Sequence, residues 1–153
     1  MTTKEAQSSS MTAPTSLDTA NTPVDLAEWV AGELASPQPD INAIVRALAH
    51  ETDRWLKVDF SSNSSARFFD EPASTGNTHW DALLEGLTAF RCDQLGVHRP
   101  AWTARTNLAV GWNPYDDSDN PPDVQWAMLD TLETPVVMLE KGVTFSLRIL
   151  ELL

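Results

Sequence analysis

The segment "DINAIVRALAHETDRWL" (residues 40–56) carries the clearest structural pattern in the chain and indicates its fold class. Asp40 is a favourable helix N-cap, because its carboxylate can accept hydrogen bonds from free N–H groups of the first turn. Behind it, apolar residues and one threonine recur at helical spacing and fall within a stripe about 100° wide. These residues are Ile41, Ile44, Val45, Leu48, Thr52, Trp55 and Leu56. The segment therefore predicts an amphipathic helix that packs on a core.

Two more helices flank this pattern. Residues 23–36 form a periodic run that is ended by the prolines following it. Residues 78–95 predict a longer helix, with Asn77 or Thr78 as its cap and Gly96 as a left-handed stop. The apolar face expected for this longer helix consists of Trp80, Leu83, Leu84, Leu87, Phe90 and Leu95.

The C-terminal half also has helical patterns. A short helix is expected after Pro100, with Gly111 ending it, and residues 113–122 are turn-forming from end to end. A helix is then predicted from Asp123 to Glu133. Its inward side should carry Val124, Met128, Leu129 and Leu132.

The last predicted helix has residues at both ends that favour its start and its stop. Thr134 is its expected cap, Pro135 its first residue, Lys141 a favourable charge in its last turn and Gly142 its stop. The following "VTFS" is compatible with a short extended segment, and the final "SLRILELL" with one or two helical turns.

These patterns together predict a mainly α protein. Residues 1–22 are rich in Thr, Ser and Ala and nearly free of large apolar side chains, which is typical of a disordered tail. Residues 23–153 should form a single compact helical domain with one short extended piece near its end. The linker at residues 58–77 contains the pair Phe68–Phe69, which fits either a short strand or a plug over the core.

Composition excludes several classes of function. The net charge is −12, from 22 acidic and 10 basic residues, and this charge repels phosphates, so nucleic-acid binding is disfavoured. The sequence contains no run of about 18 apolar residues, the length that a membrane-spanning helix needs. The start of the chain lacks the apolar region of a secretory signal, and the single Cys92 cannot form an internal disulfide. A cytoplasmic location is expected.

No set of residues predicts catalysis. The three histidines stand in unrelated contexts, and the common nucleophile, zinc-protease and phosphate-loop motifs are missing from the sequence. The loop "DDSDNPPD" (residues 116–123) has carboxylates, but prolines stand where a calcium loop needs its later ligands. We therefore predict no catalytic, metal-binding or cofactor-binding residue, and an enzymatic role is disfavoured.

A protein-binding surface is the preferred interpretation. Residues 111–135 contain six acidic side chains, no Lys or Arg, and two tryptophans. Acidic charge around aromatic anchors suits a partner with a basic surface. The candidate partner-binding residues are Arg91, Trp102, Trp112, Asp116, Asp117, Asp119 and Trp126. Core packing of the tryptophans and a structural ion pair for Arg91 remain as alternatives.

A second hypothesis uses the basic residues. Arg46, His50, Arg54 and Lys57 lie together on the polar side of the helix at residues 40–56. With Arg91, the first three could hold an anionic ligand in a small-molecule-binding or enzymatic domain. A solvated face balanced by neighbouring acidic residues is the simpler account of the same pattern.

Three motifs resemble a known family. They are "WDALLEGLTAF" from residue 80, "GVHRPAWT" from residue 96, and "TPVVMLEKGVTFSLRILELL" from residue 134. In these motifs the chain resembles an uncharacterised family of small actinobacterial proteins that are similar to antitoxin or regulator components. The resemblance implies that the chain binds and restrains a protein partner, and it carries over no catalytic residue. Some members are fused to a helix-turn-helix, which this chain lacks, so direct DNA binding is not implied.

Overall fold

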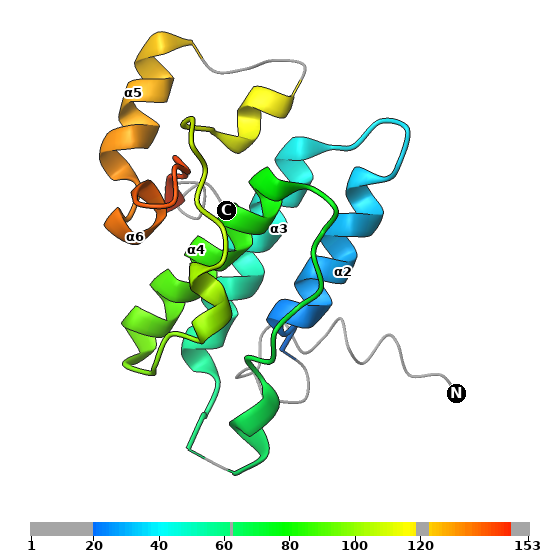
Figure 1. The fold of residues 1–153 in the computed structure, drawn as a ribbon, viewed down its shortest axis with the longest axis vertical. Coiled ribbons are helices and arrows are strands. Elements are labelled where there is room, and N and C mark those ends of the chain that lie inside the picture. The colour runs from blue at the N-terminus through cyan, green and yellow to red at the C-terminus, as the bar shows by residue number, and fades with distance from the viewer. Residues whose placement is uncertain (1–19, 62, 119–122, 148–153) are drawn as a thin grey trace.

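The computed structural model describes residues 20–61, 63–118 and 123–147, and they form a mainly helical protein (Figure 1). Most of the tail predicted at residues 1–22 lies outside this range, as do the last residues of the expected C-terminal turns. The first described residues are attached to the core. Ala20 is buried, and the carbonyl of Asn21 accepts a hydrogen bond of 2.7 Å from Trp55 Nε1. Ala20 and Asn21, which were predicted to belong to the tail, therefore contact the helical domain.

The two N-terminal helices begin and end close to the predicted positions. Helix α2 (Pro23–Leu34) has a capping box, in which the side chains of Thr22 and Asp25 accept each other's backbone N–H groups. Helix α3 (Ile41–Arg54) begins after Asp40, whose carboxylate accepts from the N–H of Ala43. The predicted apolar stripe of α3 is confirmed, except that Leu56 is exposed in the 3-10 helix that follows, η2 (Trp55–Lys57).

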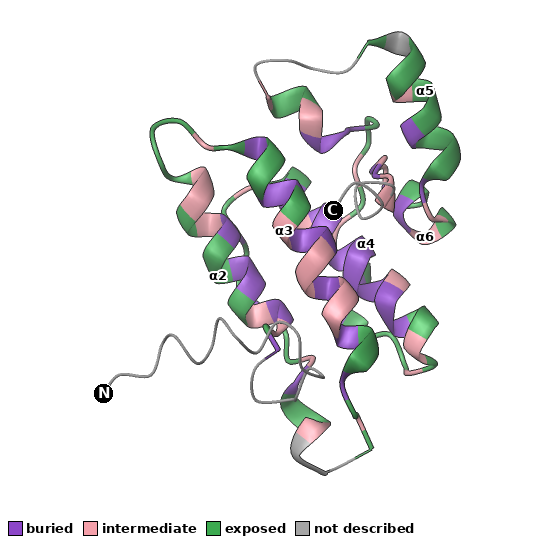
Figure 2. Cartoon of the chain, turned by 180° about the vertical axis from the view of Figure 1, so that it is seen from behind, coloured by how far each residue is buried: buried purple, intermediate pink, exposed green. Residues whose placement is uncertain are grey.

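Helix α4 (Thr78–Leu95) is the centre of the fold. Its predicted ends are confirmed: Asn77 accepts from the N–H groups of the first turn, and Gly96 has a φ of +71°. The predicted apolar face lies in or against the core, and burial extends beyond it, because every residue from 82 to 89 is buried (Figure 2). Helices α2 and α3 pack against α4, and so do helix α6 (Val136–Leu139) and the 3-10 helix η4 (Ala101–Ala104).

The linker after α3 closes one end of the core. It contains the 3-10 helix η3 (Asn63–Arg67) and then the pair Phe68–Phe69. Both rings lie edge-on to Trp55, with centroids 5.8 and 5.6 Å away, and Phe60 also packs against the pair. Of the two alternatives for this pair, a strand or a plug, the structure shows the plug.

The chain between Pro100 and Gly111 is not the predicted helix. Only η4 forms, because the backbone beyond it is hydrogen-bonded to a distant segment. The N–H of Leu108 donates to the carbonyl of Lys141, and the N–H of Trp112 to that of Gly142, both at 2.9 Å. Trp112 and Val143 form an isolated parallel bridge, so the expected extended piece at the start of "VTFS" is present.

The C-terminal helices differ from expectation in what they bury. Helix α5 (Val124–Glu133) follows the 3-10 helix η5 (Pro114–Asp117), and helix α6 (Val136–Leu139) is short. Met128, Leu129 and Leu132 were predicted to face inward and are instead exposed. The physical reason is that the side of α5 toward the protein carries Asp130, which is buried and hydrogen-bonded to Asn113. The side chain of Val124 lies outside the described residues.

Thr134 and Lys141, which were expected at the two ends of α6, have other roles. Thr134 is the C-cap of α5, where its hydroxyl donates to the carbonyl of Asp130 and accepts from the N–H of Phe145. The N-cap position of α6 is held by Pro135. Lys141 follows the end of α6 and is buried, so it does not act as an exposed charge at a helix terminus. Among the described helices, none has the length and apolar character needed to cross a membrane.

The central position of α3 and α4 predicts the effect of core truncation. Leu48 and Leu87 are both buried, so we expect either one, changed to Ala, to lower the free energy of unfolding by about 2–5 kcal/mol. Urea denaturation of the purified variants measures this. The control Leu132→Ala removes a side chain that is 79% exposed and should change stability by less than about 0.5 kcal/mol. Losses below about 1 kcal/mol at both core positions would contradict this packing.

The thiol of Cys92, the single cysteine, should react very slowly in the folded protein. Burial raises the pKa of Cys92 to about 12, with a smaller contribution in the same direction from Asp93. An unfolded cysteine has a pKa of about 8.5, so at pH 8 we expect maleimide or disulfide reagents to label native protein at least about 1,000-fold more slowly than urea-unfolded protein. Equal labelling rates in the two states would show that α4 opens readily at this position.

Candidate functional site

Arg91 is a core residue and not a surface anchor. Its side chain is 2% exposed and lies between α3 and α4. The guanidinium donates to Thr52 Oγ1 and to the carbonyl of Ala49, both at 3.1 Å, and to Gln94 Oε1 at 2.9 Å. Burial lowers the pKa of Arg91, and Asp53, 3.8 Å away, partly offsets this. The structure therefore corrects the partner-binding prediction at this position: Arg91 joins two helices.

Trp102 and Trp112 are also buried, so neither can belong to a binding surface in this fold. The indole N–H of Trp102 donates to the carbonyl of Phe69 at 2.9 Å, and that of Trp112 to Asp117 Oδ1 at 3.3 Å. Asp117 also accepts from Trp80 Nε1 at 3.3 Å. These two of the six tryptophans take the core-packing alternative.

Three of the four remaining predicted partner-binding residues are exposed. Asp116 and Asp117 are exposed, although both carboxylates also organise η5, where Asp116 accepts from the N–H of Asn113. Trp126 is 52% exposed on α5. Asp119 lies outside the described residues. The predicted surface is thus reduced to its α5 portion and the acidic residues before it.

The four residues of the alternative anion site are not brought together. Arg91 contacts Thr52 and Ala49 on the buried side of α3, whereas Arg46 is exposed on the polar side. Arg54 lies 3.4 Å from Glu51 in an ion pair along the helix. Because Arg91 is buried and its guanidinium bonds to Thr52, Gln94 and Ala49, it is not part of the exposed basic side of α3.

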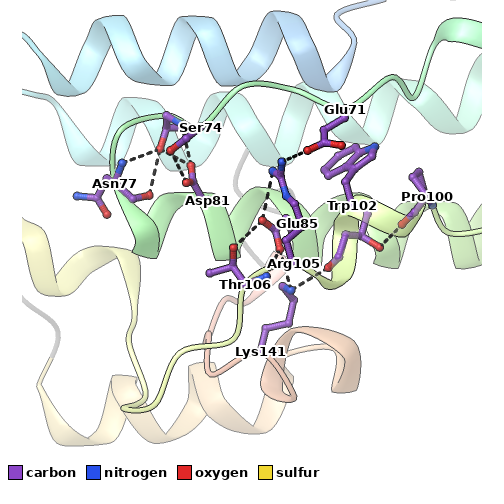
Figure 3. Close-up of polar contacts among 12 residues, drawn as sticks. Glu71, Ser74, Asn77, Asp81, Glu85, Pro100, Trp102, Arg105, Thr106 and Lys141 are labelled. Carbon is purple, nitrogen blue, oxygen red and sulfur yellow. Dashed lines mark hydrogen bonds and ion pairs between the residues drawn. The ribbon is translucent and has the colours of Figure 1, made fainter.

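A buried polar cluster that the sequence did not predict is centred on Glu85 of α4 (Figure 3). One carboxylate oxygen accepts from the backbone N–H of Thr106 at 2.8 Å and from Lys141 Nζ at 3.0 Å. The other accepts from the hydroxyl of Thr106 at 2.8 Å and from Arg105 at 3.5 Å. Lys141 also donates to the carbonyl of Thr103 at 2.8 Å. Every oxygen of the carboxylate is therefore occupied by protein donors.

This cluster holds the C-terminal segments on α4. Arg105 extends from Glu85 to Glu71, with which it forms a second ion pair, and its guanidinium lies over the ring of Trp102. Next to Glu85 in the sequence, Gly86 leaves room for α6: a Cβ at this glycine would meet Met138 Cγ at 3.1 Å and Lys141 Cδ at 3.2 Å. Because Glu85 and Lys141 are buried and satisfied by their neighbours, the cluster acts as a structural clamp.

The second feature of this half of the chain is a set of exposed apolar side chains on α5 and α6. Six of the nine exposed large hydrophobic side chains among the described residues belong to α5 and α6. We call this set the α5–α6 face; it consists of Trp126, Met128, Leu129, Leu132, Val136 and Leu139. Their exposures range from 39% to 79%. Figure 1 places α5 at the periphery of the fold, with α6 next to its C-terminal end.

The orientation of α5 explains this exposure. At 100° per residue, its four residues of the α5–α6 face span an arc of about 160° on one side of the helix. Asp130 lies outside this arc, about 40° beyond Trp126, and its carboxylate accepts from Asn113 Nδ2 at 3.2 Å. At the end of α5, Ser146 donates to Glu133 and Phe145 to Thr134. Polar contacts thus hold α5 in place, and its apolar side is turned to solvent.

The surroundings of the face are acidic. From residue 111 to residue 140 the sequence has no Lys or Arg. Exposed carboxylates stand at the start of α5, at its end and after α6, in Asp123, Glu133 and Glu140. Among the described residues, no three His, Cys, Asp or Glu side chains are grouped so that they could hold a metal ion.

Comparisons with family models, with curated proteins and with solved structures find no match to this chain.

The clamp can be tested by removing one charge at a time. Glu85→Gln or Lys141→Met strands the opposite buried charge, so we expect each to lower the free energy of unfolding by about 3–5 kcal/mol. The double variant should lose less than the sum of the two, which a double-mutant cycle in urea measures. Asp93→Asn, which breaks the exposed pair with Arg99, is the matched control and should cost less than about 1 kcal/mol. Additive losses would show that Glu85 and Lys141 are not coupled.

Proposed function

We propose that this protein is a binding module that holds a partner protein of net positive charge on the α5–α6 face. The observation that carries this proposal is the turned-out apolar side of α5 together with Val136 and Leu139 of α6. Monomeric proteins seldom gather large apolar side chains on their surface unless that surface meets something. Trp126 is the expected anchor, because tryptophan buries a large area with little loss of side-chain freedom.

The sign of the partner's charge follows from the surroundings of the face. Acidic residues flank it, and the whole chain carries −12. Such a field accelerates encounter with basic proteins and opposes nucleic acid. An antitoxin-like role, in which the partner is inactive while it is bound, agrees with the family resemblance in the sequence.

Site-specific photocrosslinking in the producing cells tests the proposal. A photoreactive residue at Met128 should form adducts with another protein that has a basic isoelectric point. The same residue at Leu56, exposed beyond the far end of α3, should form none of these adducts. Adducts that contain only this chain, or identical adducts from both positions, would contradict the proposal.

The purified pair then gives the contribution of the anchor. Trp126→Ala should raise the dissociation constant at least 10-fold, which is a loss of about 1.4 kcal/mol of binding free energy. Trp29→Ala is the matched control, because Trp29 is 38% exposed and lies on α2, away from the face. It should change the dissociation constant less than twofold, within about 0.4 kcal/mol.

A further inference from the structure

We infer that the partner presents an amphipathic α-helix to the α5–α6 face, with Lys or Arg residues beside its apolar stripe. This inference rests on the proposed function and specifies the element that is bound. The argument uses the shape of the face, the recognition modes that this fold can support, and the charges around it.

The shape of the face is that of a helix ridge. Trp126, Leu129 and Leu132 follow one another at a spacing of three residues along α5, with Met128 beside them. Val136 and Leu139, also three residues apart, belong to α6, a separate short helix that begins after Thr134 and Pro135. Helix α5 has 10 residues and is about 15 Å long, and its ridge from Trp126 to Leu132 covers about 9 Å of that length. Rows of this kind interdigitate with the rows of a second helix at about 8–10 Å between axes.

Two other recognition modes lack their structural requirement. Strand addition needs an open sheet edge, and the described part of the chain has only the isolated bridge between Trp112 and Val143. Docking of a proline-rich segment needs a groove lined by several aromatic rings, whereas the α5–α6 face contains one, Trp126. Of these three modes, a helix laid against a helix ridge is the one that fits the α5–α6 face.

Charge selects a basic helix over a second copy of this chain. Asp123 caps the start of α5 through its bond to the N–H of Trp126, and Glu133 stands at the end of the same helix. A symmetric pair of copies would bring these acidic ends together, and each copy carries −12. A foreign helix with cations beside its apolar stripe meets the same acidic ends with attraction.

A peptide panel tests the inference on the full chain. The probe is a designed 18-residue peptide with leucines on one side of the helix and lysines beside them. Three comparators change one property each: a shuffled order of the same residues, a central proline, and glutamate in place of lysine. We expect the probe to bind at least 10-fold more tightly than any comparator by titration calorimetry, and to gain helicity by circular dichroism when it binds.

Variants of the protein locate the binding. The double variant Leu129→Asp/Leu132→Asp, called the face variant, should abolish binding of the probe. The matched control Leu56→Asp should leave the dissociation constant within twofold. If the proline or shuffled peptide binds as tightly as the probe and the face variant still abolishes binding, the partner element is not a helix, while the proposed function stands. If no peptide shows binding that depends on the face, the inference is overturned, and crosslinking from Met128 decides the proposed function separately. A dimer of the chain that the face variant dissociates, seen by sedimentation, would overturn both.

Discussion

The buried carboxylate of Glu85 is the constraint on which the C-terminal half of the fold depends. A carboxylate on a fully enclosed part of α4 is tolerable only when every oxygen has a donor. Thr106, Arg105 and Lys141 supply these donors from two segments that are far from α4 in the sequence. The requirement of one charged group thus fixes the irregular chain after η4 and the end of α6 on the same helix.

This polar attachment has a consequence for the apolar residues of α5. Helix α5 is positioned by Asp130, Thr134 and their partners, and its large apolar side chains are not used for that purpose. If α5 packed on the core through its apolar stripe, those side chains would be buried and not exposed. Because polar contacts position α5, Trp126 and its neighbours are presented on a fixed backbone, which lowers the entropy that a partner must overcome.

The parts that the sequence predicted correctly are those with local signals. Asp40, Asn77 and Gly96 act on backbone groups within one turn, so the bounds of α3 and α4 followed from residue type and spacing. Periodicity shows that α5 has an apolar side, but it cannot show which way that side points, and here the prediction failed. That outcome depends on Asp130 and Asn113, which are brought together only by the tertiary fold. The same holds for Arg91, two of whose three acceptors lie on another helix, and for the failed helix after Pro100, where the backbone bonds to Lys141 and Gly142 instead.

Charge and exposed apolar surface have to be considered together in this protein. An apolar ridge on a neutral protein pairs readily with its own copies, because hydrophobic burial does not distinguish one partner from another. Here the acidic residues around the ridge add repulsion between copies, and the net charge of −12 acts in the same direction. In the proposed complex the same charges attract a basic partner, so one distribution of carboxylates would oppose pairing of copies and favour that partner. Under the proposed function, the long stretch without Lys or Arg, from residue 111 to residue 140, belongs to the binding surface and is not only a matter of composition.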